Sequence, residues 1–446
     1  MNEHGTEMYN LIQRLYPICR SITGNGVRQT LKILQEKIPL KIIEVPTGTK
    51  CYDWTIPKEW NINDAYIKDQ DGNVIVTFNE SNLHVVSYSI PVHQKLSFEE
   101  LKKHIHYIKE KPDAIPYRTS YYDENWGICM TYNQFKNMKD GTYEIFIDSS
   151  LEDGSLTYGE YFKRGKLQDE IIVSCYVCHP SLCNDNLSGV SLVTTLVSVL
   201  QNISTKFSYR FLFIPETIGA IAWLSRNELK LKNIRGGLVA TCCGDRGSIT
   251  YKRSRHHNSF IDVIVEKILR NSGDNYTVLD FWPSGSDERQ FSSPGFNIPI
   301  GSLMRTVYDE FEEYHTSEDN LSFMDEHSLG DSLAKYLDVI SELEKSDLIQ
   351  TKMNETPKPH NEHDPVFINT IMKCEPQLGK RGLYSKMGAL THQQQLDIKN
   401  AIQWLLNFSD GYHSVSEISR MSGIEFGVLI STSKFLLDAD LLRISV

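Results

Sequence analysis

The chain of 446 residues is 40% hydrophobic and 10% aromatic, and its formal net charge is −11. This length predicts two or three domains with ample buried core, and the composition is that of ordinary soluble globular proteins. The acidic balance argues against general binding to phosphate backbones, which requires a basic face. Residues 1–21 lack the continuous apolar core of a signal peptide, and no window holds the roughly 18 uninterrupted apolar residues of a membrane span. We therefore expect a cytoplasmic protein.

Two helices and a strand are predicted at the N-terminal end of the chain. Apolar residues recur at helical spacing from 7 to about 19, and Ser21 or Thr23 can cap a second helix that runs to about 36. Residues 41–45 alternate in polarity as a strand does, until a proline and a glycine interrupt the pattern.

Residues 61–137 predict an inserted, strand-rich domain of α+β or β type. It would interrupt a catalytic domain formed by residues 1–60 and 138–350, because the strand-rich core pattern resumes only after it. The insert begins with a hairpin around Asp71-Gly72 and contains an amphipathic helix over residues 97–109.

The catalytic domain is predicted to be an α/β sheet with helices on both faces, because its strands alternate with helices. The predicted strands are 142–149, 155–162, 170–176, 208–214 and 237–242, and the predicted helices are 190–200, 218–227 and 328–345. Chemistry in such sheets collects at the carboxyl ends of the strands. His179, Asp185, Glu216 and residues 241–245 all fall at such ends.

The loop after the strand 170–176 carries an imidazole and a carboxylate. His179 ends the apolar run, and Asp185 opens the sequence Asp-Asn-Leu-Ser-Gly before the next helix. Zinc takes nitrogen and carboxylate ligands that converge from loops, with a water left as the fourth ligand. His179 and Asp185 would supply half of such a site.

The nine cysteines are an odd, scattered set, which suits buried free thiols in a reducing compartment. Cys175, Cys178 and His179 match the C-x-x-C-H signature of haem attachment, but Cys175 lies inside a run that predicts a central strand. A second alternative is a zinc site of four cysteines: Cys175, Cys178, Cys242 and Cys243. The last two are adjacent and lack the usual two-residue gap, so we favour buried thiols.

Three segments together resemble the metal-binding segments of zinc aminopeptidases of the M28 type. The first is His179-Pro180 with residues 185–189; the second, residues 215–219, resembles the Glu-Glu-x-Gly segment, and the third, residues 314–319, resembles the late histidine segment. Nearly the whole chain resembles bacterial aminopeptidase-like domain proteins often met beside polysaccharide-biosynthesis genes. This resemblance implies a three-layer α/β/α mixed sheet with an inserted domain and a C-terminal winged helix.

The resemblance also implies roles for individual residues. His179, Asp185 and His315 would bind one zinc, and Glu216 would act as the general base of amide hydrolysis. A carboxylate at the start of a helix, favoured by the helix dipole, is the alternative for Glu216. Thr217 stands where the family has its second glutamate, which favours a single zinc over two.

Three further carboxylates are candidates for supporting the ligands or for binding a second metal: Asp245, Asp287 and Asp319. Asp245 can instead cap the turn that follows Gly244, which we favour, and Asp287 can instead cap the start of a helix. Glu288 stands where the resembled family commonly has histidine.

Five side chains are candidates for substrate contacts: Tyr121, Tyr122, Trp126, Arg289 and Arg305. The polar and aromatic segment 118–126 is either a rigid surface loop or a lid over the metal. The two arginines can bind a substrate carboxylate, although isolated arginines usually only solvate a surface.

The C-terminal part begins with a predicted linker, residues 351–364, and continues as a domain of residues 365–446. Its helix-turn-helix pattern and closing strand resemble a winged helix. From Thr356 onward there are nine Lys and Arg and nine Asp and Glu, and the candidate recognition helix carries only Lys434. A groove-reading helix normally carries several basic or amide side chains. We therefore expect a protein-contact or dimerisation element, with DNA binding as the alternative.

The sequence thus predicts a zinc-dependent hydrolase of the aminopeptidase type. Its substrate would be an amide in a peptide, an amino-acid conjugate or an amino-acylated sugar. Two alternatives stay open: acyl transfer or deacylation at the zinc site in polysaccharide biosynthesis, and a non-catalytic scaffold that recruits partners through the winged helix. A homo-oligomer is compatible with either.

Overall fold

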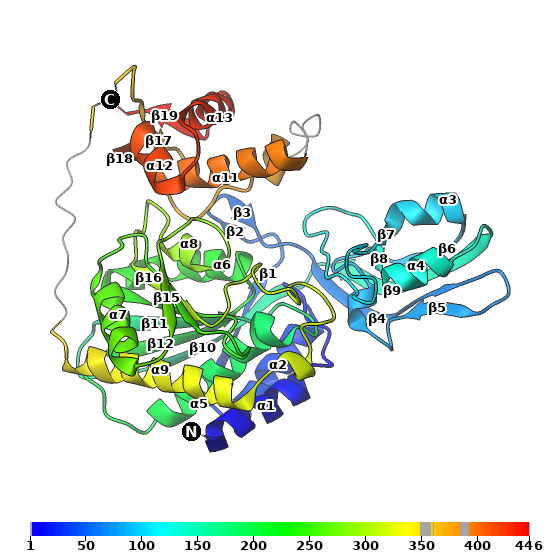
Figure 1. The fold of residues 1–446 in the computed structure, drawn as a ribbon, viewed down its shortest axis with the longest axis horizontal. Helices are drawn as coiled ribbons and strands as arrows, with labels where there is room; N and C mark the ends of the chain where they lie inside the picture. Colours follow the sequence, from blue (N-terminus) through cyan, green and yellow to red (C-terminus); the bar gives the residue numbers. More distant parts are fainter. Residues whose placement is uncertain (1, 348–357, 360, 384–391, 446) are drawn as a thin grey trace.

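The structure is a computed structural model that describes residues 2–347, 358–359, 361–383 and 392–445. It has three parts: a body, an arm that projects from it, and a C-terminal domain that lies against the body (Figure 1). Of the predicted linker 351–364, residues 351–357 and 360 lie outside the described residues. Lys358 already packs on the C-terminal domain, since its N–H donates to the carbonyl of Gly411 at 2.9 Å.

An eight-stranded mixed sheet forms the centre of the body. In spatial order its strands are β1 (Lys41–Pro46), β10 (Ser155–Lys163), β12 (Ser208–Ile214), β11 (Glu170–Tyr176), β13 (Ile234–Ala240), β16 (Ile300–Met304), β14 (Ile249–Lys252) and β15 (Tyr276–Leu279). The four strands from β12 to β16 are parallel neighbours. Every residue of β11 and β12 is buried, which explains their nearly unbroken apolar sequences.

Helices cover both faces of this sheet, as predicted. One face is covered by α1 (Asn2–Leu15), α2 (Asn25–Gln35), α5 (Gly189–Leu200), α7 (Phe260–Ser272) and α9 (Glu326–Lys345), and the other by α6 (Ile218–Arg226) and α8 (Glu288–Phe291). Short helical turns lie at η3 (Cys183–Ser188), η4 (Glu228–Asn233) and η5 (Leu321–Phe323). Alternate residues of β11 point to opposite faces: Val173 and Cys175 pack with α1 and α5, whereas Ile172 and Tyr176 pack with α6. The three-layer prediction is confirmed.

The arm is built on a four-stranded sheet in the order β5-β4-β9-β6. These strands are β4 (Glu59–Lys68), β5 (Val74–Thr77), β6 (Val92–Ser97) and β9 (Thr142–Glu152). Smaller elements complete it: β2 (Lys50–Cys51) and β3 (Trp54–Thr55) at its base, then η1 (Asn82–His84), α3 (Phe98–Leu101), η2 (Lys102–His104), β7 (Ile105–His106), β8 (Ile128–Cys129) and α4 (Tyr132–Asn137). The predicted helix over 97–109 is therefore wrong beyond its first turns, because the chain enters β7.

The predicted boundaries of the insert are also corrected. The strand predicted at 142–149 was assigned to the body, but β9 pairs with β4 from Glu59↔Glu152 to Lys68↔Glu144. The arm therefore extends to about residue 152, and β10 is the strand that returns to the central sheet. The local sequence identifies a strand but does not say which sheet it joins.

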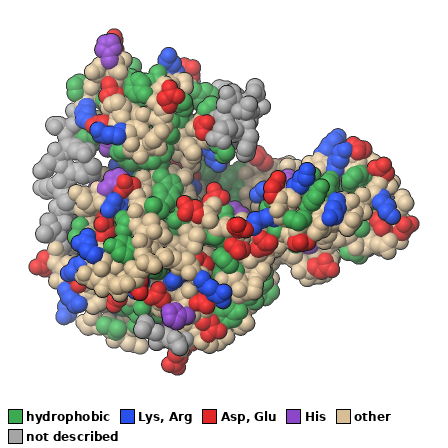
Figure 2. Space-filling model, in the orientation of Figure 1, with side chains coloured by type: hydrophobic (Ala, Val, Ile, Leu, Met, Phe, Trp, Pro, Cys, Tyr) green, Lys and Arg blue, Asp and Glu red, His purple; other side chains and the backbone are tan. Residues whose placement is uncertain are grey.

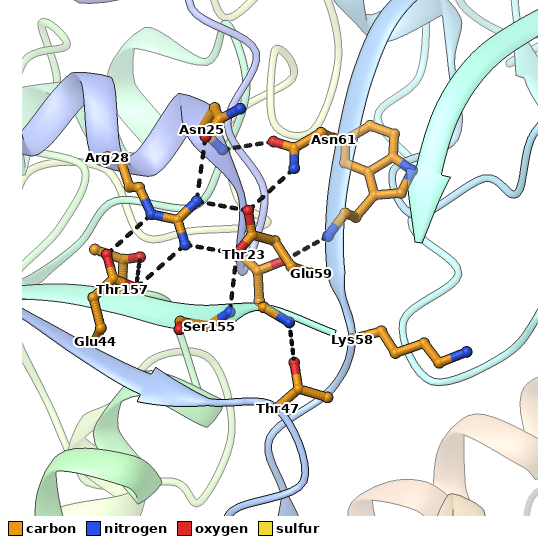
Figure 3. Close-up of polar contacts among 12 residues, drawn as sticks. Thr23, Asn25, Arg28, Glu44, Thr47, Lys58, Glu59, Asn61, Ser155 and Thr157 are labelled. Carbon is orange, nitrogen blue, oxygen red and sulfur yellow. Dashed lines mark hydrogen bonds and ion pairs between the residues drawn. The ribbon is translucent and has the colours of Figure 1, made fainter. Parts of the chain in front are cut away.

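A partly buried polar network ties the start of the arm to the body (Figure 3). Arg28 on α2 forms two hydrogen bonds of 2.6 Å with Glu59, the first residue of β4, and also contacts Glu44 on β1 at 3.0 Å. Glu59 further accepts from the backbone N–H of Ser155 at 2.9 Å. The network thus links α2, β1, β4 and β10 at one point.

This network makes the stability of the junction sensitive to acid. The hydrogen bonds from Arg28 lower the pKa of Glu59 from 4.5 to about 2. Such a carboxyl stabilises the fold above its unfolded pKa and loses that contribution as pH falls through the folded pKa. We expect the thermal midpoint of the wild-type protein to exceed that of a Glu59→Gln variant at pH 7, and the difference to vanish between pH 4.5 and pH 2. A difference that stays constant with pH would contradict this assignment.

The C-terminal domain has the predicted helix-turn-helix and a three-stranded sheet in the order β18-β17-β19. Its elements are β17 (Val366–Asn369), η6 (Gly379–Arg381), α11 (His392–Phe408), β18 (Asp410–Ser414), α12 (Val415–Ser422), α13 (Phe426–Asp438) and β19 (Leu442–Ile444). Acidic and basic side chains are interspersed over the face of the molecule in Figure 2, without a stripe of one sign. In the described part of the chain, no helix combines the length and apolarity needed to cross a bilayer.

Candidate metal centre

The site lies where three parallel strands end together. β12, β11 and β13 are neighbours in register, so their carboxyl ends meet at one edge of the sheet. His179 follows β11, Glu216 follows β12 and Thr241 follows β13 directly. His315 comes from the irregular segment between β16 and α9. The structure therefore brings together side chains that are far apart in the sequence.

His179, Asp185 and His315 form a compact group of three metal-ligating side chains, with their ligand atoms within 4.8 Å of one another. Asp185 Oδ2 lies 3.0 Å from His315 Nε2 and 4.0 Å from His179 Nε2. Ligand atoms held at about 2.1 Å in tetrahedral geometry lie roughly 3.4 Å apart. The observed separations therefore suit one cation of this kind.

Two buried atoms support the same conclusion. Asp185 Oδ2 and His315 Nε2 face each other at 3.0 Å, and neither forms a hydrogen bond to any other described group. Because buried polar atoms are normally well satisfied, a carboxylate oxygen and an imidazole nitrogen that face only each other are suited to binding a cation between them. Two imidazoles and one carboxylate form a donor set that zinc commonly takes, and the residues fit this ion.

The protonation states also suit a cation. Burial lowers the pKa of His179 from 6.5 to about 4, so its ring is neutral near pH 7 and keeps a free lone pair. Burial alone would raise the pKa of Asp185, but the neighbouring His179 and His315 outweigh it and lower the pKa to about 2. Asp185 is therefore ionised, as a metal ligand must be.

Asp185 is held from two sides. The Tyr176 hydroxyl donates to Asp185 Oδ1 and also contacts Thr241 Oγ1 at 2.6 Å. Asp319 accepts from the backbone N–H groups of Asn184 at 2.6 Å and of Asp185 at 2.9 Å. Asp319 thus supports the loop that carries the ligand, as was predicted for it, and burial raises its pKa to about 8.

Glu216 lies beside this group, with Oε2 3.8 Å from His179 Nε2 and 23% of its side chain exposed. It also lines a cavity of about 760 Å³, together with His179 and His315. Burial and the neighbouring Asp287 raise the pKa of Glu216 well above its ordinary value. The pKa would fall again in the field of a bound cation, because an opposite charge favours the ionised form. This is a position from which a carboxylate can exchange a proton with a water.

Asp287 does not cap the helix that it precedes. Its Oδ1 accepts from the backbone N–H of Thr217 at 2.7 Å, so it supports the segment that carries Glu216. Burial raises the pKa of Asp287 to about 7. Thr217 Oγ1 accepts a hydrogen bond of 2.9 Å from Arg289, so a cationic side chain stands beside the residue that replaces the second glutamate.

Two predicted substrate contacts lie away from the cavity and are corrected. Trp126 packs in the core of the arm and stacks on His104 with 3.9 Å between the ring centroids, because it is an interior residue of that domain. Arg305 donates to the carbonyl of Gly247 at 2.8 Å and pairs with Asp331 at 3.0 Å. Both instead have structural roles.

The other predicted substrate contacts line the cavity: Tyr121, Tyr122 and Arg289. Asp245 is a turn cap, as favoured, since its Oδ1 accepts from the Gly247 N–H at 2.6 Å and from Thr306 Oγ1 at 2.6 Å. Its Oδ2 accepts from Asn184 Nδ2 at 2.9 Å, so both oxygens are occupied by protein groups.

The cysteines do not assemble a site of four sulfurs. The described residues contain two groups that could hold a metal, and Cys178 is the only cysteine in either, beside His179 and Glu216. All nine cysteines are free, and Cys175 is fully buried within β11. This arrangement agrees with buried thiols.

Sequence reasoning missed two residues around the ligands. The Tyr117 ring contacts both imidazoles, 5.3 Å from the ring of His179 and 5.2 Å from that of His315, and the Tyr117 backbone N–H donates to the His315 carbonyl at 2.8 Å. Buried Arg20 donates from Nε to the His179 carbonyl at 2.9 Å. No sequence signal identifies these contacts, because both residues come from distant segments.

The body has the fold of M28-type zinc aminopeptidases. It matches the zinc aminopeptidase of Bacillus subtilis with a TM-score of 0.57 at 12% identity, covering 77% of this chain and 97% of that one. It matches an M28 peptidase precursor of Shewanella amazonensis with a TM-score of 0.53 at 11% identity, covering 78% and 97%. At these identities the likeness concerns the fold alone.

The chain belongs to the family described as domain of unknown function DUF4910, whose model matches residues 9–346. Residues 366–444 match a winged helix-turn-helix model, which confirms the predicted C-terminal module. A Clostridium acetobutylicum protein named for polysaccharide biosynthesis and an aminopeptidase-like domain is 52% identical over 99% of this chain and 97% of its own. A crystal structure from that organism, provisionally described as a peptidase, has a TM-score of 0.76 at 51% identity, covering 99% and 97%.

Proposed function

We propose that this protein is a zinc-dependent hydrolase of the aminopeptidase type that cleaves an amide bond in a peptide, an amino-acid conjugate or an amino-acylated sugar. The observation that carries this proposal is the convergence of His179, Asp185 and His315 on one point, with Glu216 3.8 Å from His179 at the edge of a cavity. The name of the Clostridium relative supports a conjugate from polysaccharide biosynthesis.

One ion is proposed rather than two. Thr217 offers a hydroxyl where a second carboxylate would be needed, and that hydroxyl accepts a hydrogen bond from Arg289. Asp245 is also engaged, because its oxygens accept hydrogen bonds from protein groups. The second group of possible ligands among the described residues, Cys178, His179 and Glu216, shares His179 with the first group, which also favours one ion.

In the proposed reaction, His179, Asp185 and His315 would hold the zinc, which would supply a Lewis acid for the substrate carbonyl and for water. Glu216 takes the proton from the attacking water and passes it to the leaving amine, so that the C–N bond breaks as the proton arrives. Asp287 fixes the Glu216 segment through the Thr217 N–H, and Tyr117 packs edge-on against both imidazoles and helps to fix their orientation.

The zinc site is tested by replacing one ligand. The binding free energy of zinc in structural sites is about 10–16 kcal/mol. Divided over four ligands, the loss of one ligand corresponds to roughly 3 kcal/mol, or about 100-fold in affinity. We expect an Asp185→Asn variant to lose about this much zinc affinity in a chelator competition. Wild-type activity on an aminoacyl anilide should disappear with a chelator and return with zinc.

An Asp245→Asn variant is the matched control, because Asp245 is an equally buried carboxylate whose oxygens bind protein groups. It is expected to keep wild-type zinc affinity. Equal affinity in the Asp185→Asn variant would place the ion elsewhere. A protein that binds no zinc and gains no activity from it would favour the scaffold alternative.

A further inference from the structure

The cavity beside Glu216 extends far beyond the metal ligands. Its volume of about 760 Å³ lies between the body, the arm and the C-terminal domain. Ligand pockets of about 300–1,000 Å³ enclose drug-sized molecules, so an amide with a small side chain would leave most of this space empty. The proposed function therefore leaves the greater part of the cavity unexplained.

One face of α11 forms a wall of this cavity. Lys399, Gln403, Leu406 and Asn407 line it, at the spacing of a single helical face. The segment 374–380, which precedes α11, lines the cavity as well. Figure 1 shows α11 on the side of the C-terminal domain that faces the body. We call these α11 residues together with segment 374–380 the C-terminal wall.

The C-terminal wall is firmly docked to the body. Arg255 is buried; its Nε donates to Asn407 Oδ1 at 2.9 Å and its guanidinium pairs with Asp410. Arg381 forms hydrogen bonds of 2.6 and 3.0 Å with the two carboxylate oxygens of Asp53. The buried Arg255–Asp410 pair joins the C-terminal domain to the body, and the Arg381–Asp53 pair joins it to the base of the arm, so both contacts hold the C-terminal wall against the cavity.

The charges of the C-terminal wall are largely neutralised by the body. Glu375 pairs with Arg289 at 3.1 Å, and Lys380 pairs with Asp53 at 2.6 Å. Apart from Glu216 at the proposed metal site, two further charged side chains line the cavity, Lys399 and Asp123, and no described residue forms an ion pair with either. Because these two have opposite signs, the pocket does not select a substrate of one net charge.

The remaining lining combines flat aromatic rings with neutral hydrogen-bonding groups. Trp54 and Tyr122 contact each other edge to face, with centroids 5.4 Å apart, and Tyr121 lies in the same cavity. Gln377 and Gln403 add side-chain amides, each with both donors and acceptors. Aliphatic side chains line the cavity as well, among them Ile22, Ile218, Leu378 and Leu406, so apolar surface and hydrogen-bonding groups alternate around it. A pyranose ring has an apolar C–H face and a rim of hydroxyls, which this lining fits.

We propose that the winged-helix domain forms the far wall of the substrate pocket and recognises an uncharged, hydroxyl-rich body, such as an amino sugar, to which the scissile amide is attached. This inference rests on the proposed function for the position of the amide. It gives the C-terminal domain a role in substrate recognition. A helix that reads DNA would present a basic face. The exposed face of α13 instead carries Lys434 and Asp438, which have opposite charges, so it does not favour DNA as the ligand of this domain.

Binding measurements test this proposal without requiring turnover. The probes are glycyl-glucosamine, with glycine on the 2-amino group, and glycinamide, which lacks the sugar. Both are titrated calorimetrically into the zinc-supplemented, full-length Glu216→Gln protein. Hydrogen-bonding sites reject analogues that lack the matching hydroxyls, so we expect glycyl-glucosamine to bind at least about 10-fold more tightly. Equal affinities, or no binding of either probe, would overturn the sugar assignment.

A substitution on α11 tests the wall itself. Gln403→Trp, added to the same protein, would fill part of the cavity and is expected to weaken glycyl-glucosamine binding by at least about 10-fold. Gln403→Ala, which removes the amide without adding bulk, should weaken it in the same direction. Asn400→Trp is the matched control, because Asn400 is exposed on the same helix and does not line the cavity. Unchanged binding of glycyl-glucosamine in both Gln403 variants would refute the proposal that the C-terminal wall contacts the substrate.

Hydrolysis then separates this proposal from the proposed function. The wild-type protein is assayed with glycyl-glucosamine and with alanine anilide. If the protein cleaves the anilide and shows no preference for the sugar amide, sugar recognition by the C-terminal wall is refuted and the hydrolase proposal stands. If binding of glycyl-glucosamine depends on Gln403 but neither amide is cleaved, the hydrolase proposal is refuted and sugar recognition by the C-terminal wall stands.

Discussion

Replacing Glu216 with glutamine is expected to lower kcat for amide hydrolysis by about 10²- to 10⁴-fold, because a side-chain amide cannot accept the proton of the attacking water. The change preserves the shape of the side chain and removes only its basicity. Zinc affinity should stay within about threefold of wild type, since the proposed ligands are His179, Asp185 and His315. KM should change much less than kcat, because Glu216 acts in the transition state.

The measurement is steady-state hydrolysis of an aminoacyl anilide with zinc content determined on the same samples. Glu312→Gln is the control, because Glu312 is an exposed carboxylate near His315 whose nearest cation, Lys111, is 3.9 Å away. It is expected to behave as wild type. A Glu216→Gln protein that loses its zinc would instead assign Glu216 to the ligands, in the second group with Cys178 and His179. Full activity with zinc bound would exclude Glu216 as the base.

Replacing Lys252 with methionine is expected to destabilise the body by about 3–5 kcal/mol. Lys252 and Glu288 form an ion pair of 2.5 Å in which both side chains are 0% exposed. Burial lowers the pKa of Lys252 from 10.5 to about 8, so the pair already carries a desolvation cost. Methionine would leave Glu288 as an uncompensated buried carboxylate. For a domain of this size the loss corresponds to a fall of about 10 °C in the thermal midpoint.

The double variant Lys252→Met/Glu288→Gln distinguishes the cost of an unpaired charge from a general packing defect. Removing both charges should recover much of the lost stability, since buried ion pairs contribute little beyond their own desolvation. Arg253→Met is the partly exposed control: Arg253 pairs with Glu266 and with exposed Asp280, and its loss should cost much less than the loss of Lys252, about 1 kcal/mol. A double variant as unstable as Lys252→Met would show that packing, rather than charge, dominates at this position.

Part of the candidate site was accessible from local sequence because its residues follow strands. An unbroken apolar run identifies β11 as a central strand, and the carboxyl ends of parallel strands meet at one edge of the sheet. The local sequence therefore places His179 and Glu216 at this edge. His315 could not be placed in this way, because it lies in an irregular segment with no periodic pattern, and only its resemblance to a family segment indicated it. Its backbone φ of +53° is also one that non-glycine residues rarely adopt.

The errors share one cause, which is that sheet membership and burial are not local properties. β9 was assigned to the body because it has the pattern of any half-buried strand, yet it pairs with β4 in the arm. Trp126 belongs to a polar and aromatic segment that resembles a lid, but its ring is covered by His104. In both cases the partner comes from a distant part of the chain, and periodicity contains no information about it.

The sequence by itself determined the class of fold, the order of the domains and the loops that carry His179, Asp185 and Glu216. It could do so because hydrophobic periodicity and turn residues report on each element separately. Only the tertiary structure decided that Tyr117 contacts the two imidazoles, that Asp319 holds the Asp185 loop, and that α11 lines the cavity. These contacts depend on how rigid elements pack, and packing is set by the shapes and charges of surfaces that meet only when the whole chain has folded.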